Sequence, residues 1–320
     1  MKIAERIKQH NVLWYATLLA LCLLSVLLLL NTWSSRKTLQ QQRYALLKEV
    51  AAAHAFYLEN EINYSFGMAQ NLANGLVDLI ASGRNRRPLA DELAQQGLRL
   101  NPKLLGLSSY WEPNAFDGQD AHYAGVAPYD ASGRLFTWWH RLRGEIAAET
   151  YTLQTVPEPE KVYPWYYTPK RTLKRFVTEP YVDSIGGQQL WLMSLVVPIV
   201  REGKFLGVVG ADYLLADFQQ ILSRQTAFNR QAKLQLISYG GIYASHPNPA
   251  WLGKKAPEIT DKVRQAMAEG TVLIQPSANG EQLSVFYPIR FPDVKEKWVL
   301  YMAVPVTALE QSSPFGWQQP

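Results

Sequence analysis

The sequence predicts an α+β protein in which a transmembrane helix continues into a long helix and is followed by two modules built on antiparallel sheets. Three observations predict this class. An uncharged apolar run near the N-terminus is long enough to cross a bilayer. Residues 38–82 repeat apolar side chains at helical spacing, and the remainder alternates short β-rich runs with turn signals. Short connections of this kind favour antiparallel pairing.

Composition excludes several classes of protein. The chain has 320 residues and is 48% apolar, which leaves room for about two domains with real cores. Its 32 Lys and Arg are interspersed with 27 Asp and Glu, so the net charge of +5 forms no basic block for a nucleic acid. Cys22 is the only cysteine, which excludes an internal disulfide framework.

No enzyme motif is present in the sequence. The five histidines are scattered without metal-ligand spacing, and there is no phosphate-binding loop, nucleophile elbow or zinc-protease motif. We therefore expect no catalysis, no cofactor and no metal site.

The first element is a membrane span. Val12–Leu30 reads VLWYATLLALCLLSVLLLL without a charge, and Trp14, Tyr15 and Trp33 stand at its ends, where amphipathic rings favour the interface. A cleaved secretory signal is the alternative, but its apolar region is normally shorter and NTWSSR offers no cleavage site. We expect a transmembrane helix over residues 12–33.

Flanking charges set the expected orientation. Lys2, Arg6 and Lys8 hold residues 1–11 in the cytoplasm, although Arg36 and Lys37 weaken the asymmetry. The expected location is a bacterial inner membrane, crossed once, with the bulk of the chain in the periplasm.

The second element is a long stalk helix over residues 37–84. It ends at Ser82-Gly83, with Pro88 soon after. The helix could serve only to cover a sheet, or it could also offer a homodimer seam, and both readings can hold for different portions. Its predicted apolar stripe is Leu47, Ala51, Leu58, Ile62, Phe66, Ala69, Leu72, Leu76 and Ile80.

Two sheet-forming modules follow, over residues 85–222 and 223–308, with a tail at 309–320. A short helix near 89–99 opens the first module and LADFQQILSRQ forms a helix at its end. The predicted strands of the first module are LLGLSSYWEP, GRLFTWWHRL, KRFVTEPYVD, QLWLMSLVVPIV and KFLGVVGADYLL; those of the second are KLQLISYGGIYASH, GTVLIQPS, EQLSVFYPIR and KWVLYMAVPV.

Aromatic and charged residues gather between residues 136 and 212. In VYPWYYTPKR, four rings lie within five positions between two prolines, which forms either a core corner or the wall of a ligand site. Strand alternation sends Trp139, Arg141 and Arg143 to one face and Trp138 and His140 to the other.

Carboxylates accompany these rings. Asp183 follows Tyr181 in EPYVDS, and Asp212 follows an apolar strand. Rings with one or two carboxylates suit an organic cation, whereas an Arg would grip a carboxylate. Alternatively the rings are core, and Asp212 caps the helix that begins near Leu214. The candidate ligand-binding residues are Trp138, Trp139, Arg141, Trp165, Tyr166, Tyr181, Asp183 and Asp212.

The order of motifs resembles the extracytoplasmic double Cache (dCache) sensor domain of bacterial chemoreceptors, sensor histidine kinases and diguanylate cyclases. The resemblance rests on PWYYTP, TEPYVD, LMSLVVPIV, GKFLGVVGADYLL and GGIYASHPNPAWLGK, and it spans roughly residues 37–308. It implies a long helix and two stacked PAS-like sheets, with a small ligand bound in the membrane-distal one. It also implies that Trp165 and Tyr166 are the family's WY pair, Tyr181 its pocket tyrosine and Asp212 the holder of a ligand amino group.

The sequence departs from the family pattern at two points. Members that bind amino acids carry Arg two places before the Trp, where this chain has Tyr163, so an amino-acid ligand would need Arg141 or Arg143 instead. No second membrane span or signalling domain follows Pro305. We expect a membrane-anchored sensor module that binds a small nitrogenous molecule for signal transduction or chemotaxis and passes its state to a separate signalling protein. The alternatives are a periplasmic scaffold without a ligand or a receptor fragment.

Overall fold

A computed structural model describes residues 2–142, 144–149, 152–224, 227–228, 230–277 and 279–311. Arg143 and the last nine residues of the predicted tail lie outside these ranges. The chain divides into two compact units, Met1–Glu49 and Val50–Pro320. Helix α1 (Lys2–Ala81) supplies the described part of the first unit and the first element of the second.

The first unit contains the predicted membrane span. By length and composition, one helix in the described ranges, Thr17–Ala81, could cross a membrane, and its most apolar window has a mean hydropathy of 2.0. The leucines between Leu18 and Leu30 are half or more exposed, and so are Trp14 and Trp33. Tyr15 lies among the residues whose side chains the structure does not describe. Such exposure is expected of a helix that faces lipid.

In the second unit, α1 buries the predicted apolar stripe. The members from Ala51 to Leu76 are buried, whereas Ile80 keeps partial exposure. The helix ends at Ala81, one residue before the predicted Ser82, where Gly83 takes a left-handed φ of 67°. Because the buried positions recur at three- and four-residue steps, one face of the helix packs on the sheets.

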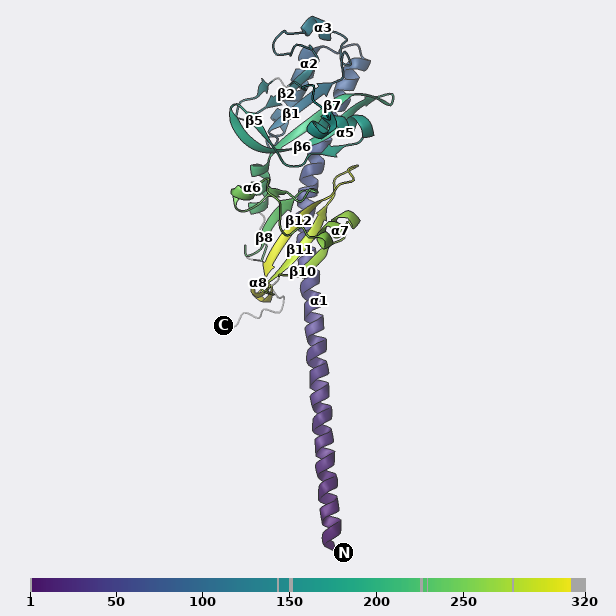
Figure 1. The fold of residues 1–320 in the computed structure, drawn as a ribbon, viewed down its shortest axis with the longest axis vertical. Helices are drawn as coiled ribbons and strands as arrows, with labels where there is room; N and C mark the ends of the chain where they lie inside the picture. Colours follow the sequence, from purple (N-terminus) through teal and green to yellow (C-terminus); the bar gives the residue numbers. More distant parts are fainter. Residues whose placement is uncertain are drawn as a thin grey trace. The chain divides into compact units, whose positions relative to one another are not determined.

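The first sheet contains the strands predicted for the first module, and its pairing is antiparallel as expected. Its path is β3-β2-β1-β7-β6-β4, with β5 paired to β6, and every pair is antiparallel (Figure 1). The strands are β1 (Gly106–Trp111), β2 (Phe136–His140), β3 (Ala147–Glu149), β4 (Phe176–Val177), β5 (Tyr181–Ile185), β6 (Gln188–Arg201) and β7 (Lys204–Leu214).

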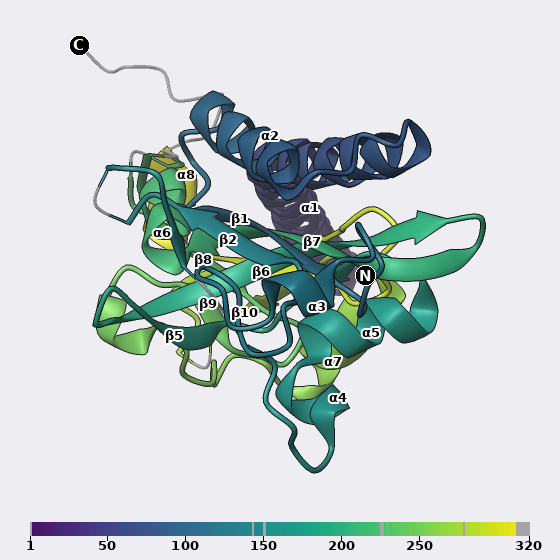
Figure 2. The same ribbon diagram turned by 90° about the horizontal axis from the view of Figure 1, so that it is seen from above.

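Helices cover both faces of this sheet. Helices α1 and α2 (Arg87–Leu100) lie on one side, and α5 (Pro164–Thr172) lies on the other (Figure 2). The hydroxyls of Ser65 on α1 and Tyr213 on β7 are hydrogen-bonded to each other, so the side chain of Tyr213 lies on the face of the sheet that α1 covers. The short helices α3 (Asp120–Tyr123) and α4 (Pro159–Val162) stand in the connections.

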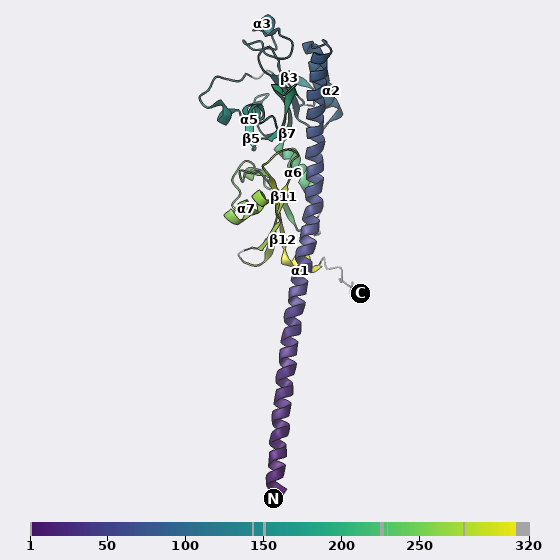
Figure 3. The ribbon, with the colours of Figure 1, turned by 90° about the vertical axis from the view of Figure 1, so that its right-hand side faces the viewer.

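The second sheet has the order β10-β11-β12-β8-β9, again antiparallel throughout. Helix α1 runs along one side of this sheet and α7 lies on the other (Figure 3). On the α1 side, the backbone N–H of Arg290 donates to Glu59 Oε1 at 2.8 Å. Val263 and Met267 of α7 pack on the other face. The elements are α6 (Leu215–Arg224), β8 (Lys233–Ile237), β9 (Tyr243–Ser245), a 3-10 turn (Pro249–Trp251), α7 (Asp261–Glu269), β10 (Leu273–Pro276), β11 (Gln282–Ile289), β12 (Trp298–Pro305) and α8 (Val306–Gln311).

The structure adds short elements to the prediction. VYPWYYTPKR contains the nine-residue helix α5, because Pro164 occupies the first helical position, where its fixed φ suits a helix start. Strand β3 and helices α3, α4 and α7 are also additions. Helix α8 extends to Gln311, three residues into the segment predicted to be a tail.

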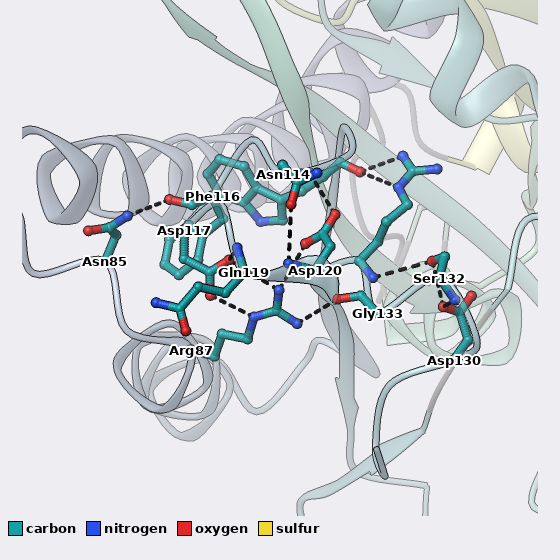
Figure 4. Close-up of polar contacts among 12 residues, drawn as sticks. Asn85, Arg87, Asn114, Phe116, Asp117, Gln119, Asp120, Asp130, Ser132 and Gly133 are labelled. Atoms are coloured by element: carbon teal, nitrogen blue, oxygen red, sulfur yellow. Dashed lines mark hydrogen bonds and ion pairs between the residues drawn. The ribbon is translucent and has the colours of Figure 1, made fainter. Parts of the chain in front are cut away.

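A buried arginine fastens the long β1–β2 connection to α2 (Figure 4). Arg87 is 1% exposed. Its Nε and Nη2 donate to the two carboxylate oxygens of Asp117 at 2.8 and 3.1 Å, and Nη2 also donates to Asp120 Oδ1 at 2.9 Å. Its Nη1 donates to the carbonyl of Gly133 at 2.8 Å. Because the connection leads from β1 into β2, this network holds two of the strands that contribute to the site described below.

Candidate functional site

The face of the first sheet under α5 has a floor of very small side chains. Ser108 on β1 pairs with Trp138 on β2 and with Gly210 on β7, and Gly106 pairs with Asp212. A Cβ on Gly106 would lie 2.5 Å from Trp138 Nε1, so glycine makes room for the indole. Ser108 keeps partial exposure although its strand lies between two others, which means that solvent reaches the floor.

Asp212 lies at the edge of this floor and is 6% exposed. Its Oδ2 accepts a hydrogen bond from Trp138 Nε1 at 2.7 Å, and its Oδ1 accepts one from Ser194 Oγ at 2.5 Å. The hydroxyl of Tyr181 lies 2.8 Å from Ser194 Oγ. Asp212, Trp138, Ser194 and Tyr181, here called the Asp212 cluster, come from four strands that the antiparallel register brings side by side.

Burial raises the pKa of Asp212 to about 6. The hydrogen bonds from Ser194 and Trp138 oppose this shift, and the nearby charge of Asp183 adds to it. In the described ranges no cationic side chain forms an ion pair with Asp212, so both of its hydrogen-bond donors are neutral. Above pH 6 this site therefore holds a desolvated negative charge without a countercation from the described residues.

Aromatic rings surround the floor. Trp138 packs against two buried apolar clusters and so joins them. Trp165 packs against the first of these clusters, which contains Tyr166, and Tyr181 packs against the second. Trp165 meets Tyr110 edge to face, with 5.7 Å between ring centroids. The side chain of Tyr166 is buried, and its hydroxyl donates to Glu112.

Arg134 completes the environment of Tyr166. Its Nη2 donates to the Tyr166 hydroxyl at 3.1 Å, and its guanidinium lies 4.6 Å from the ring centroid of Tyr110. Burial and the bond to Glu112 raise the pKa of Tyr166. The hydroxyl of Tyr166 is thus engaged by protein groups, and its ring is buried in an apolar cluster, so this candidate residue supports the site from the core.

The predicted alternation along β2 is confirmed, and it separates the candidate residues. Trp139 Nε1 donates to Asp91 Oδ1 on α2 at 3.1 Å, and Arg141 donates to the carbonyl of Leu98 on the same helix. Both side chains therefore lie on the face opposite Asp212, and the structure does not bring them to the candidate site. The geometry therefore does not support Arg141 as a residue that binds a ligand carboxylate.

The other predicted residues lie on the α5 face. Asp183 is two positions beyond Tyr181 on β5 and accepts a hydrogen bond from the backbone N–H of Ser184 at 2.7 Å. Tyr163 is buried at the start of α5, and its hydroxyl accepts from the backbone N–H of Gln154 at 3.2 Å.

Sequence reasoning missed Ser194 and left His140 without a role. Ser194 is the one polar residue within LMSLVVPIV, and an isolated hydroxyl in an apolar strand is a signal that could have identified it. His140 is buried and stacks beside Trp138, with 4.6 Å between ring centroids, and its Nε2 lies 3.5 Å from Glu149 Oε1. It forms the side of the site next to the indole.

Comparisons with known proteins agree with this architecture. Residues 92–220 match the family model of the first PDC sensor domain of methyl-accepting chemotaxis protein-like sequences. The methyl-accepting chemotaxis protein TlpQ of Pseudomonas aeruginosa is 24% identical over 341 residues, covering 95% of this chain and 48% of the relative. The chain thus spans about half the length of this curated relative.

Solved structures of sensor domains share the fold. The extracellular domain of a protein described as the histidine kinase mmHK1S-Z3 has a TM-score of 0.70 and 25% identity, covering 84% of this chain and 96% of that chain. The ligand-binding domain of the Pseudomonas fluorescens chemoreceptor CtaA, solved with L-isoleucine, has a TM-score of 0.57 and 19% identity, covering 87% and 98%. The chain therefore carries a double Cache (dCache) sensor module of the type found in bacterial chemoreceptors and sensor histidine kinases.

Proposed function

We propose that this sensor module binds a small nitrogenous organic cation at the Asp212 cluster. The observation that supports the proposal is a buried carboxylate held by two neutral donors, beside an indole and a floor of glycine and serine. An ammonium or protonated heterocycle would pair with Asp212 and place its remaining surface on the rings. Amines, purines and amino acids are the candidate classes, and the L-isoleucine bound by CtaA also carries an ammonium group.

We infer that the chain is anchored by a single span in a bacterial inner membrane, with the sensor module in the periplasm. The apolar run of α1 and the basic residues before it support this topology. The state of the module would be read by a signalling region or protein outside residues 37–308, and a homodimer through α1 would suit that role.

A thermal-shift screen tests the binding proposal. The full chain in detergent micelles is screened against primary amines, purines, amino acids and dicarboxylates. A ligand at about 100 times its Kd adds roughly 2.7 kcal/mol to the free energy of unfolding, so an amine or purine should raise the Tm clearly. Stabilisation by dicarboxylates alone would contradict a carboxylate-centred site, and no stabilisation by any class would favour a scaffold role.

Binding of a cation should depend on pH in a defined direction. The ligand pairs with ionised Asp212, whose pKa in the free chain is raised to about 6. Affinity should therefore be flat above pH 6, while the ligand stays protonated, and fall about tenfold per pH unit below it. Calorimetric titrations of the best amine from the screen at pH 5, 6, 7 and 8 measure this. A flat profile down to pH 5 would show that the ligand does not pair with Asp212.

A further inference from the structure

The segment Ser238–Gly253, which includes the edge strand of the second sheet, is contacted by residues of the first module. It contains a turn, strand β9 and the 3-10 turn, and it overlaps the sequence motif GGIYASHPNPAWLGK. The segment is internally braced, because Ser238 N–H donates to the Ile242 carbonyl at 2.8 Å and Gly253 N–H donates to the Tyr243 carbonyl at 2.9 Å. These two hydrogen bonds join the ends of the segment to strand β9 and to the residue before it.

Glu179 makes the first of these contacts. Its carboxylate accepts a hydrogen bond from Ser238 Oγ at 2.5 Å and another from the backbone N–H of Gly240 at 2.9 Å. A Cβ at position 240 would lie 2.6 Å from Glu179 Oε2, so only glycine allows this approach. Two hydrogen bonds to one carboxylate, one of them from the backbone, make a directional contact.

Trp191 and Gln219 make two more contacts with the same segment. The indole of Trp191 on β6 lies against Gly253, where an added Cβ would come within 1.9 Å of the ring. The side-chain oxygen of Gln219 on α6 accepts a hydrogen bond from Ser245 Oγ at 2.5 Å.

Each of these contacts is made by a residue that lies on, or directly next to, a strand with a member of the Asp212 cluster. Glu179 stands two residues before Tyr181, at the start of β5, and Trp191 stands three residues before Ser194 on β6. Strand β7, which holds Asp212, runs directly into α6 and Gln219. The strands that carry Tyr181, Ser194 and Asp212 are thus each connected to Ser238–Gly253 by a nearby contact.

The connection from the Asp212 cluster to Ser238–Gly253 passes through the fewest residues at Glu179. Thr178 N–H donates to the Ser194 carbonyl at 3.0 Å, and Ser194 N–H donates to Thr178 Oγ1 at 2.8 Å. Tyr181 bonds the Ser194 hydroxyl. Glu179 therefore lies between two residues that both hold Ser194, and Ser194 is bonded directly to Asp212.

We propose that Glu179 is the coupling residue through which the state of the Asp212 cluster reaches the second sheet. A ligand that pairs with Asp212 competes with Ser194 for the carboxylate, which changes the Ser194–Tyr181 contact and shifts the Thr178–Tyr181 segment. Glu179 moves with that segment, and its hydrogen bonds with Ser238 and Gly240 are strengthened or broken as a result. The assignment of a ligand to the cluster rests on the proposed function, but the linkage itself is a property of the ligand-free chain.

Hydrogen–deuterium exchange on the full chain in detergent micelles tests the linkage without a ligand. Ser194→Ala removes the hydroxyl that joins Asp212 to Tyr181. It should raise the exchange rate at least fivefold in peptides that cover residues 238–245, and this increase should vanish when Glu179→Ala is also present. Glu258→Ala is the matched control, since Glu258 accepts a hydrogen bond from the hydroxyl of Tyr243, which lies within the same segment. The Ser194→Ala effect should persist in that background.

Two results would overturn the inference. An exchange increase confined to first-sheet peptides would show that the cluster is not coupled to the second sheet. An increase at residues 238–245 that survives Glu179→Ala would show that Glu179 does not carry the coupling. Neither result bears on ligand binding, which the thermal-shift screen decides separately.

Discussion

Arg87→Met is expected to lower the free energy of unfolding of the sensor module by about 3–5 kcal/mol. The substitution keeps an unbranched apolar stem but leaves the carboxylates of Asp117 and Asp120, which are 4% and 9% exposed, without their cation. It also removes the hydrogen bond that Arg87 Nη1 donates to the carbonyl of Gly133. An isolated buried charge costs more than the pair gains, so the loss exceeds that of an ordinary hydrogen bond.

The same substitution removes a ring contact. The guanidinium of Arg87 lies 3.9 Å from the ring centroid of Tyr123 and 4.6 Å from that of Tyr129, both in the β1–β2 connection. Arg87→Lys keeps the charge but cannot form the forked bond to Asp117, so it should fall between the wild type and Arg87→Met.

Thermal unfolding of the full chain in micelles measures the effect of Arg87→Met, which should lower the Tm by roughly 6–20 °C. Arg99→Met is the control, because Arg99 is exposed on the same helix and bonds only Gln95 among the described residues. It should change the Tm by less than about 1 °C. Equal values for the two variants would show that the β1–β2 connection is held by its apolar contacts alone.

The strands and the long helix were predictable because their signals are local. Apolar periodicity identified α1 over several turns. Most strands were located as β-rich runs bounded by glycine-containing turns, and the run KRFVTEPYVD divides into β4 and β5. Helix α5 was not predicted, since PWYYTPKRT contains a proline in its interior and rings on all sides. Strand β3 was missed because AAE gives no periodic signal and takes its conformation from pairing with Trp138–His140.

The sequence predicted the types of residue that form the candidate site but not which of the candidates come together. Aromatic density nominated both tryptophans of β2, and alternation showed that they face opposite ways, yet the sequence gives no means of telling which face Asp212 shares. That choice depends on the register of β1 against β7, which places Gly106 opposite Asp212. Ser194 was missed for the same reason, because its bond to Asp212 comes from the β6–β7 pairing.

Two long-range charged contacts left no signature in the sequence. Arg87 meets Asp117 across 30 positions, and Glu179 meets Ser238 across 59. Each of these residues looks like an ordinary solvated charge until the strands are assembled. Arg87 and Glu179 were therefore absent from the predicted site, although each joins segments that lie far apart in the sequence.

Asp212→Asn should separate ligand binding from stability. Above pH 6 the wild-type carboxylate would pair with a cation in a desolvated place, and truncating such a pair typically costs 2–5 kcal/mol, a loss of roughly 30-fold to several thousand-fold in affinity. The amide is isosteric and still accepts from the Trp138 indole N–H, so the fold should remain. Calorimetry with the best amine from the screen measures the loss.

Stability should move in the opposite direction from affinity. The pKa of Asp212 in the folded chain, about 6, exceeds its ordinary value of 3.8, so the ionised carboxylate destabilises the fold as pH rises from 4 through 6. Asp212→Asn removes that cost, and its Tm at pH 7 should equal or exceed that of the wild type. Asp217→Asn is the control, because burial also raises the pKa of Asp217 but no Trp138 or Ser194 donor reaches it; it should leave affinity unchanged. If Asp212→Asn instead lowered the Tm and kept the affinity, Asp212 would be a structural residue, and the buried charge would need an explanation other than a ligand.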